Sequence, residues 1–185
     1  MTRLPPISED KLTASQTKVL EAIKNSPRGD IPMTGPFGVW LRAGDIGDAI
    51  QNLGASLRYG TTLDEKVKEF AICVVGHHYK AKFEFAYHER LALKSGISEE
   101  ILNDLKNNDM PSFTEERLNL TYQISKQLLG SHSISDELYQ QGFDEFGEQG
   151  MIELVSLVGY YCLVSLTLNS FQIPLDDGME DPFPD

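Results

Sequence analysis

A glutamate and a histidine stand four positions apart in an aromatic segment of the sequence. Glu84 and His88 would project from the same face of a helix, and Phe83, Phe85 and Tyr87 surround them. A carboxylate beside an imidazole in apolar surroundings can fix the ring tautomer and raise the basicity of the ring, which suits general acid–base catalysis near neutral pH. The commoner use of this spacing is an ion pair on the surface of an amphipathic helix.

A third ionisable residue, Glu69, lies in the apolar segment that precedes this pair. A carboxylate is costly to bury there unless it is hydrogen-bonded, so it needs either solvent or a partner. Two antiparallel helices joined at residues 79–80 would place Glu69 and His88 at similar heights, at a rise of about 1.5 Å per residue. We therefore expect Glu69 to approach His88, with an exposed ion pair to Lys66 or Lys68 as the alternative.

Two further histidines, His77 and His78, end the helix that is predicted to carry Glu69. An imidazolium ring interacts favourably with a helix C-terminus, so we expect these side chains to cap the helix. A metal site would need Glu84, His88 and one of the two, yet the sequence has no zinc-type spacing such as His-Glu-x-x-His. We expect no metal.

The remaining composition restricts the class of protein. The net charge of −12 argues against a non-specific binder of nucleic acid or of an anionic membrane, because both need clustered Lys and Arg.

Cys73 and Cys162 lie far apart in apolar segments, as buried unpaired thiols do. With no visible signal peptide or disulfide framework, we expect a cytoplasmic protein. The longest apolar stretch, Leu154–Leu168, is expected to be a buried helix too short to cross a membrane.

Apolar residues recur at helical spacing along most of the chain, and alternation typical of strands does not occur. The sequence therefore predicts an all-α helical bundle that forms a single domain over residues 1–175. A loop rich in proline and glycine, residues 26–38, leads to Trp40 and Arg42. Residues 176–185 hold five acids and no base, and we expect an irregular tail. The predicted helices cover residues 8–25, 45–59, 63–78, 81–94, 98–105, 114–129, 136–146 and 149–170.

Short motifs spread over nearly the whole chain form one pattern. They are Arg3-Leu4-Pro5-Pro6; Gly35-Pro36-Phe37 with Trp40-Leu41-Arg42; Lys68-Glu69-Phe70-Ala71-Ile72; Glu84-Phe85 with His88, Ala92 and Gly96-Ile97; and Leu157-Val158-Gly159-Tyr160-Tyr161 with Leu168-Asn169-Ser170-Phe171 and Ile173-Pro174-Leu175. In these motifs the chain resembles the carboxymuconolactone decarboxylase family, which includes the alkyl-hydroperoxidase D-like proteins. It is similar to a longer branch of that family without a Cys-x-x-Cys pair.

The resemblance implies an alkyl-hydroperoxidase D-like bundle that assembles as a homo-oligomer, a trimer or a hexamer. It also implies a small-molecule substrate and no cofactor. The glutamate and histidine of the family's thiol site fall on Glu69 and His88, and its two cysteines fall on Ala81 and Glu84. Disulfide exchange needs two sulfurs, so a peroxidase or peroxiredoxin activity is a weaker alternative.

The leading hypothesis is a cofactor-free lyase or isomerase that acts on a small lactone or oxo acid. In it, His88 is the acid or base, Glu84 orients the ring and Glu69 completes the proton relay. Besides the antioxidant activity, the alternative is a non-catalytic oligomer that binds a small ligand. An arginine could hold a substrate carboxylate, although an arginine at a helix end is commonly solvated. The candidate substrate-binding residues are Trp40, Arg42, Arg58 and Tyr160.

Overall fold

The computed structural model describes residues 2–5, 7–30 and 33–184. Within these ranges the chain forms eight α-helices, two short 3-10 helices and no strand, which confirms the all-α prediction. Its Cα atoms group into two compact units, Met1–Gly60 with Thr167–Pro174, and Thr61–Leu166 with Leu175–Asp185. The single domain expected over residues 1–175 stays a prediction.

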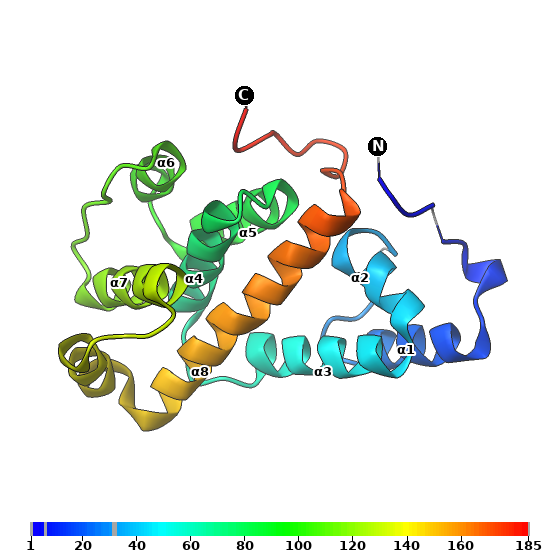
Figure 1. The fold of residues 1–185 in the computed structure, drawn as a ribbon, viewed down its shortest axis with the longest axis horizontal. Helices are drawn as coiled ribbons and strands as arrows, with labels where there is room; N and C mark the ends of the chain where they lie inside the picture. Colours follow the sequence, from blue (N-terminus) through cyan, green and yellow to red (C-terminus); the bar gives the residue numbers. More distant parts are fainter. Residues whose placement is uncertain (1, 6, 31–32, 185) are drawn as a thin grey trace. The chain divides into compact units, whose positions relative to one another are not determined.

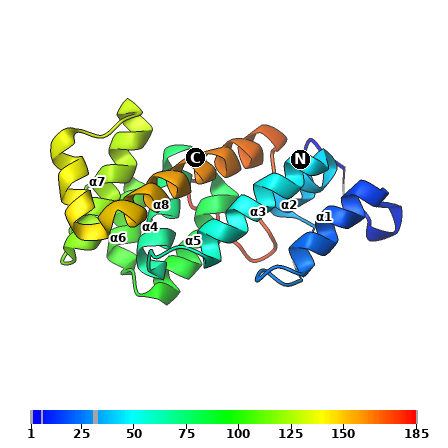
Figure 2. The same ribbon diagram turned by 90° about the horizontal axis from the view of Figure 1, so that it is seen from below.

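The first unit contains η1 (Glu9–Lys11), α1 (Ala14–Lys24), α2 (Gly35–Trp40), η2 (Leu41–Ala43) and α3 (Asp45–Tyr59), shown in blue to cyan in Figures 1 and 2. Glycine is required where α3 begins, because a Cβ on Gly47 would lie 2.0 Å from the carbonyl oxygen of Trp40. The apolar core of this unit consists of Val19, Leu20, Ile23 and Leu41, with Ile7, Leu12, Met33 and Phe37 packed against them.

Two boundaries in the first unit differ from the prediction. The helix expected over residues 8–25 is interrupted, because Thr13 and Gln16 form a capping box that starts α1 afresh. The predicted loop ends early, because Pro36 in the first turn of α2 has a backbone suited to a helix start.

The second unit is arranged around α4 (Glu65–His78). Every residue from Val67 to His77 is buried, and α5 (Lys82–Ser95), α6 (Glu99–Asn107) and α7 (Glu116–Ser131) pack against this helix. The predicted start at residue 63 was two residues too early, because the Asp64 side chain accepts a hydrogen bond from the Val67 amide at 2.9 Å and caps the helix. A carboxylate on this part of the helix is therefore shielded from solvent.

Helices α4 and α5 approach each other closely at one glycine. A Cβ on Gly76 would lie 3.2 Å from the backbone nitrogen of Phe85, so a larger residue would push the helices apart. The connection is short, with Lys80 at φ 48° and the Ala81 amide donating to the Gly76 carbonyl at 2.9 Å. Gly96, at φ 98°, ends α5. This pairing fixes the heights of residues on the two helices.

The last helix, α8 (Asp136–Phe171), is bent at Gly147, whose φ of 70° and ψ of 176° are not helical. The bend separates the two helices predicted over residues 136–146 and 149–170, and Figure 1 shows the yellow and orange parts running in different directions. Within the described residues, α8 is the helix whose length and composition would allow it to cross a membrane, and half of its most apolar window is buried in the protein. The length argument made for Leu154–Leu168 therefore does not hold, and a soluble cytoplasmic protein stays a prediction.

Candidate functional site

Helices α4 and α5 bring together the three residues expected to carry chemistry. The Nδ1 atom of His88 lies 2.6 Å from Glu69 Oε2, and its Nε2 atom lies 3.1 Å from Glu84 Oε1. The three side chains are 7%, 2% and 4% exposed for His88, Glu69 and Glu84, respectively. The predicted approach of Glu69 to His88 is therefore confirmed, and the pair on α5 is buried rather than on the surface.

The alternative partners proposed for Glu69 are engaged elsewhere. Lys66 forms an ion pair with Glu115 at 2.7 Å, and Lys68 forms one with Glu65 at 2.6 Å. Both acids belong to the surface of the unit, whereas Glu69 faces inward at the centre of α4. A buried carboxylate stabilises a fold only with a hydrogen-bonded partner, and His88 provides one.

The two carboxylates decide the protonation of His88. Burial by itself would lower the pKa of the ring, but Glu84 and Glu69 outweigh burial and raise the pKa above its ordinary value of 6.5. Both ring nitrogens face an oxygen, an arrangement that only the imidazolium satisfies with two donated hydrogen bonds. The two acids therefore favour the imidazolium form of a ring that is almost fully buried.

Tyr161 of α8 completes one side of the site, and the sequence did not single it out. Its ring packs edge-on against the imidazole of His88, with centroids 5.3 Å apart and an interplanar angle of 81°. Tyr160, the predicted binding residue, contacts Tyr161 at 5.2 Å and is thus one ring further away. The signals for Tyr161 were its place in the family motif that ends Tyr160-Tyr161 and its spacing of seven and four residues from the buried Leu154 and Leu157.

The other candidate binding residues, Trp40, Arg42 and Arg58, belong to the first unit. Trp40 is buried and packs edge-on against Phe37 at 5.4 Å. The guanidinium of Arg42 donates to the carbonyl oxygens of Gly38 and Pro5, which ties the start of the chain to α2. Its contacts indicate a structural role, and substrate binding by these three residues stays a prediction.

The expectation for the two histidines at the end of α4 was wrong in its charge state. Burial, followed by the nearby charge of Lys80, lowers the pKa of His77 to about 4, and burial also lowers the pKa of His78. The His77 ring is therefore neutral at pH 7. The neutral His77 accepts a hydrogen bond from Lys80, whose Nζ lies 2.9 Å from Nε2.

Sulfur chemistry and metal binding find no support in the described part of the chain. Both cysteines are unpaired, and burial raises the pKa of Cys73 far above its ordinary value and that of Cys162 to a smaller extent. Thiols of this kind stay protonated and are poor nucleophiles. Among the described residues, no group of three His, Cys, Asp or Glu side chains is disposed to hold a metal ion.

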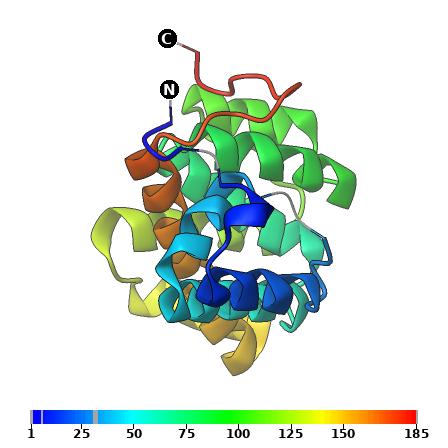
Figure 3. The same cartoon turned by 90° about the vertical axis from the view of Figure 1, so that its right-hand side faces the viewer.

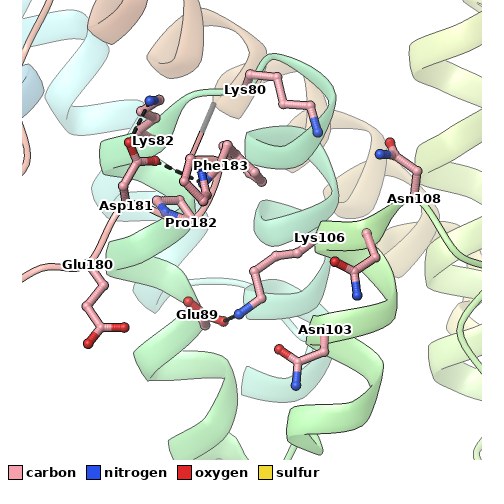
Figure 4. Close-up of a pocket in the computed structure, with 12 residues that line it drawn as sticks. Lys80, Lys82, Glu89, Asn103, Lys106, Asn108, Glu180, Asp181, Pro182 and Phe183 are labelled. Atoms are coloured by element: carbon pink, nitrogen blue, oxygen red, sulfur yellow. Dashed lines mark hydrogen bonds and ion pairs between the residues drawn. The ribbon is translucent and has the colours of Figure 1, made fainter.

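A pocket of about 770 Å³ adjoins the other side of α5 (Figure 4). Glu89 and Lys106, which form an ion pair at 2.7 Å, line it together with residues of α6 and of the C-terminal segment. None of Glu69, Glu84 and His88 is among the lining residues. The pocket and the buried histidine are therefore separate features of the second unit.

Comparison with known proteins shows the fold. The structure is similar to the crystal structure of the debrominase Bmp8 in its apo form, with a TM-score of 0.71 and 8% sequence identity, over 93% of this chain and 91% of that chain. The chain thus shares an all-helical fold with that protein, in agreement with the predicted all-α class. No family model matches the sequence, and no curated protein matches it. Membership of the carboxymuconolactone decarboxylase family stays a prediction.

Proposed function

We propose that this protein is a cofactor-free enzyme that moves a proton with His88, as a lyase or isomerase of a small lactone or oxo acid. The observation that carries the proposal is the buried imidazole held between two carboxylates from neighbouring helices, at 2.6 and 3.1 Å. Perturbed ionisable groups of this kind gather at catalytic sites. The class of substrate rests on the family resemblance.

The two distances suggest how the roles divide. The shorter contact, to Glu69 on the central helix, favours Glu69 as the group that orients the ring and stabilises its charge. The longer contact, from Nε2 to Glu84, favours Glu84 as the group that moves away when a substrate approaches Nε2. This division reverses the initial assignment, in which Glu84 oriented the ring and Glu69 relayed the proton.

Such a site suits loss of CO2 from a β-oxo or lactone acid. The bond between the carboxylate carbon and the α-carbon breaks, and its electron pair moves into the neighbouring carbonyl to give an enolate. The imidazolium of His88 stabilises that charge and delivers its Nε2 proton to the α-carbon, and solvent restores the proton. An isomerisation uses the same donor after Glu84 has removed a proton. Neither reaction needs an electron acceptor.

The likeness to a debrominase supports a catalytic use of this fold, because that neighbour is an enzyme. The antioxidant alternative has less support here, since the aligned thiol positions hold Ala81 and Glu84 and the two cysteines are unpaired, with raised pKa values. The position of a thiol is taken by Glu84, a carboxylate hydrogen-bonded to His88. A carboxylate at that position can still transfer a proton, but it cannot take part in disulfide exchange.

The test is a screen of lactone acids and β-oxo acids by ultraviolet absorbance, with unmodified protein, His88→Gln and Glu84→Gln. For a substrate that turns over, we expect His88→Gln to lower kcat/KM at least about 100-fold, the usual contribution of a general acid or base. The matched control is His132→Asn, which changes an exposed histidine at the end of α7 and should leave kcat/KM unchanged.

Three results would count against the proposal. Equal turnover by unmodified protein and His88→Gln would remove His88 from the chemistry. Thermal stabilisation by a compound that stays chemically unchanged would favour the ligand-binding alternative. Peroxide reduction with a thiol donor that disappears in a Cys73→Ser, Cys162→Ser double variant would restore the antioxidant alternative.

A further inference from the structure

The C-terminal segment folds back onto the start of α5 (Figures 3 and 4). Asp181 forms an ion pair with Lys82 at 2.6 Å through Oδ2, and its Oδ1 accepts a hydrogen bond from the Phe183 amide at 2.9 Å. One carboxylate thus fixes both the attachment point and the turn that presents the Phe183 ring. Pro182, between the two, restricts the backbone and lowers the entropy lost on docking.

The Phe183 ring lies against three side chains of the folded unit. Its centroid is 5.0 Å from that of Phe85 and 5.7 Å from that of His77, at interplanar angles of 60° and 63°. The Nζ atom of Lys80 lies 4.5 Å from the ring centroid, within cation–π distance. Edge-on aromatic pairs and a cation over the ring face add to the simple burial of apolar area. Phe183 is therefore the anchor of the C-terminal segment.

The receiving residues belong to the end of α4, the short connection after it and the start of α5. With the tail in place Phe85 is fully buried, and the hydrogen bond from Lys80 to the neutral His77 orients the ammonium group. We call His77, Lys80, Lys82 and Phe85 the tail groove. The pocket of about 770 Å³ extends from it along α6, so space for a peptide continues beyond the residues that the tail covers (Figure 4).

We propose that the tail groove is a recognition site for peptide segments of the form acid–Pro–Phe, and that its occupant is this chain's own segment Asp181–Phe183. Two features give the specificity: the lysine ammonium of Lys82 selects the carboxylate, and the seat formed by Phe85, His77 and Lys80 selects the aromatic ring. The tail is covalently attached, so its effective concentration at the groove is on the order of millimolar. It therefore keeps the groove closed to other segments of the same chemistry. The proposal is independent of the catalytic role of His88.

The test uses a fluorescently labelled peptide of residues 176–184 and full-length protein. In Phe183→Ala the anchor is lost and the groove is vacated, so we expect saturable binding of the peptide, measured by anisotropy, at least about tenfold tighter than to unmodified protein. Adding Lys82→Glu to that variant should weaken binding about fivefold, as expected for an exposed ion pair of about 1 kcal/mol. A peptide with Asp181→Lys should recover binding to the Lys82→Glu protein.

The matched control is Lys94→Glu in the same background, because Lys94 is an exposed lysine in the last turn of α5. It should leave the affinity unchanged. Equal affinity of the peptide for unmodified protein and Phe183→Ala, or no saturable binding to either, would overturn the proposal.

A second measurement needs no variant. In the unmodified protein the Phe183 amide is hydrogen-bonded to Asp181, so it should exchange its hydrogen at least about tenfold more slowly than a free peptide amide. Exchange at the rate of the free peptide would overturn docking of the tail. Protection that grows with protein concentration would show that a second copy supplies the tail, which would overturn occupancy within one chain.

Discussion

His88 contacts two acids at unequal distances. The contribution of this buried cluster to the free energy of unfolding can be compared with that of an exposed ion pair. Glu69 lies at the centre of α4, where an altered partner leaves a buried polar group imperfectly satisfied. The cost of such a change exceeds what an exposed ion pair contributes.

We therefore expect Glu69→Gln to lower the free energy of unfolding by about 2–3 kcal/mol at pH 7, measured by urea denaturation. The matched control is Glu89→Gln, which removes the charge from a partly exposed pair with Lys106 at 2.7 Å and should cost about 0.5 kcal/mol. Equal losses in the two variants would contradict a buried, strongly coupled pair at His88.

The raised pKa of His88 sets the sign of a pH dependence. Because the folded pKa lies above the unfolded value, protonation of this ring favours the folded state fully below about pH 6.5. That contribution is lost as the pH rises through the folded pKa. We expect His88→Gln to lack this component of the stability profile.

Nuclear magnetic resonance titration should show a pKa above 6.5 for His88 and a lower one in Glu84→Gln; an unchanged pKa in that variant would contradict the role of Glu84.

At the scale of elements, the close approach of α4 and α5 positions Glu69 beside His88. Gly76 permits that approach, since a Cβ there would lie 3.2 Å from the Phe85 nitrogen. Other helical glycines, such as Gly130 in α7, have open space where a Cβ would be.

We expect Gly76→Ala to destabilise the protein by about 1–3 kcal/mol, because backbone has to shift to relieve the overlap. Gly130→Ala is the matched control and should be neutral or stabilising by up to about 1 kcal/mol, since alanine favours the helix. Thermal unfolding of both variants measures the difference. Similar melting temperatures for the two would show that the helices do not need the glycine.

At the scale of the whole molecule, α8 exposes a stripe of apolar side chains. The spacing of these residues places them on one side of the helix, as the predicted homo-oligomer requires. They are Ile152, Val155, Leu163 and Leu166, which are 61%, 40%, 38% and 51% exposed.

We predict that the protein is a trimer or hexamer and that Ile152→Glu shifts it toward monomer in analytical ultracentrifugation, because burying a charge in an apolar interface is costly. Met110→Glu, at an exposed loop position, should leave the assembly unchanged. An unmodified protein that sediments as a monomer at all concentrations would contradict the prediction.

The sequence by itself determined the helical class, the bounds of α3 and α5 within one residue or so, and the pairing of Glu84 with His88. Those features depend on local spacing, on glycine at a helix end and on a fixed rise per residue, which sequence records directly. The antiparallel geometry of α4 and α5 also allowed the contact of Glu69 with His88 to be expected.

Only the tertiary structure decided what surrounds those residues. Burial and the charge of Lys80 make His77 neutral, and the packing of α8 places Tyr161 rather than Tyr160 against His88. The tail attaches to α5 through Phe183, although its composition predicted only irregular backbone. The contacts of Tyr161 and Phe183 join groups distant in sequence, and the pKa of His77 depends on burial as well as on the neighbouring Lys80. Desolvation and ring packing are properties of the assembled surroundings, and no local pattern of residue types encodes them.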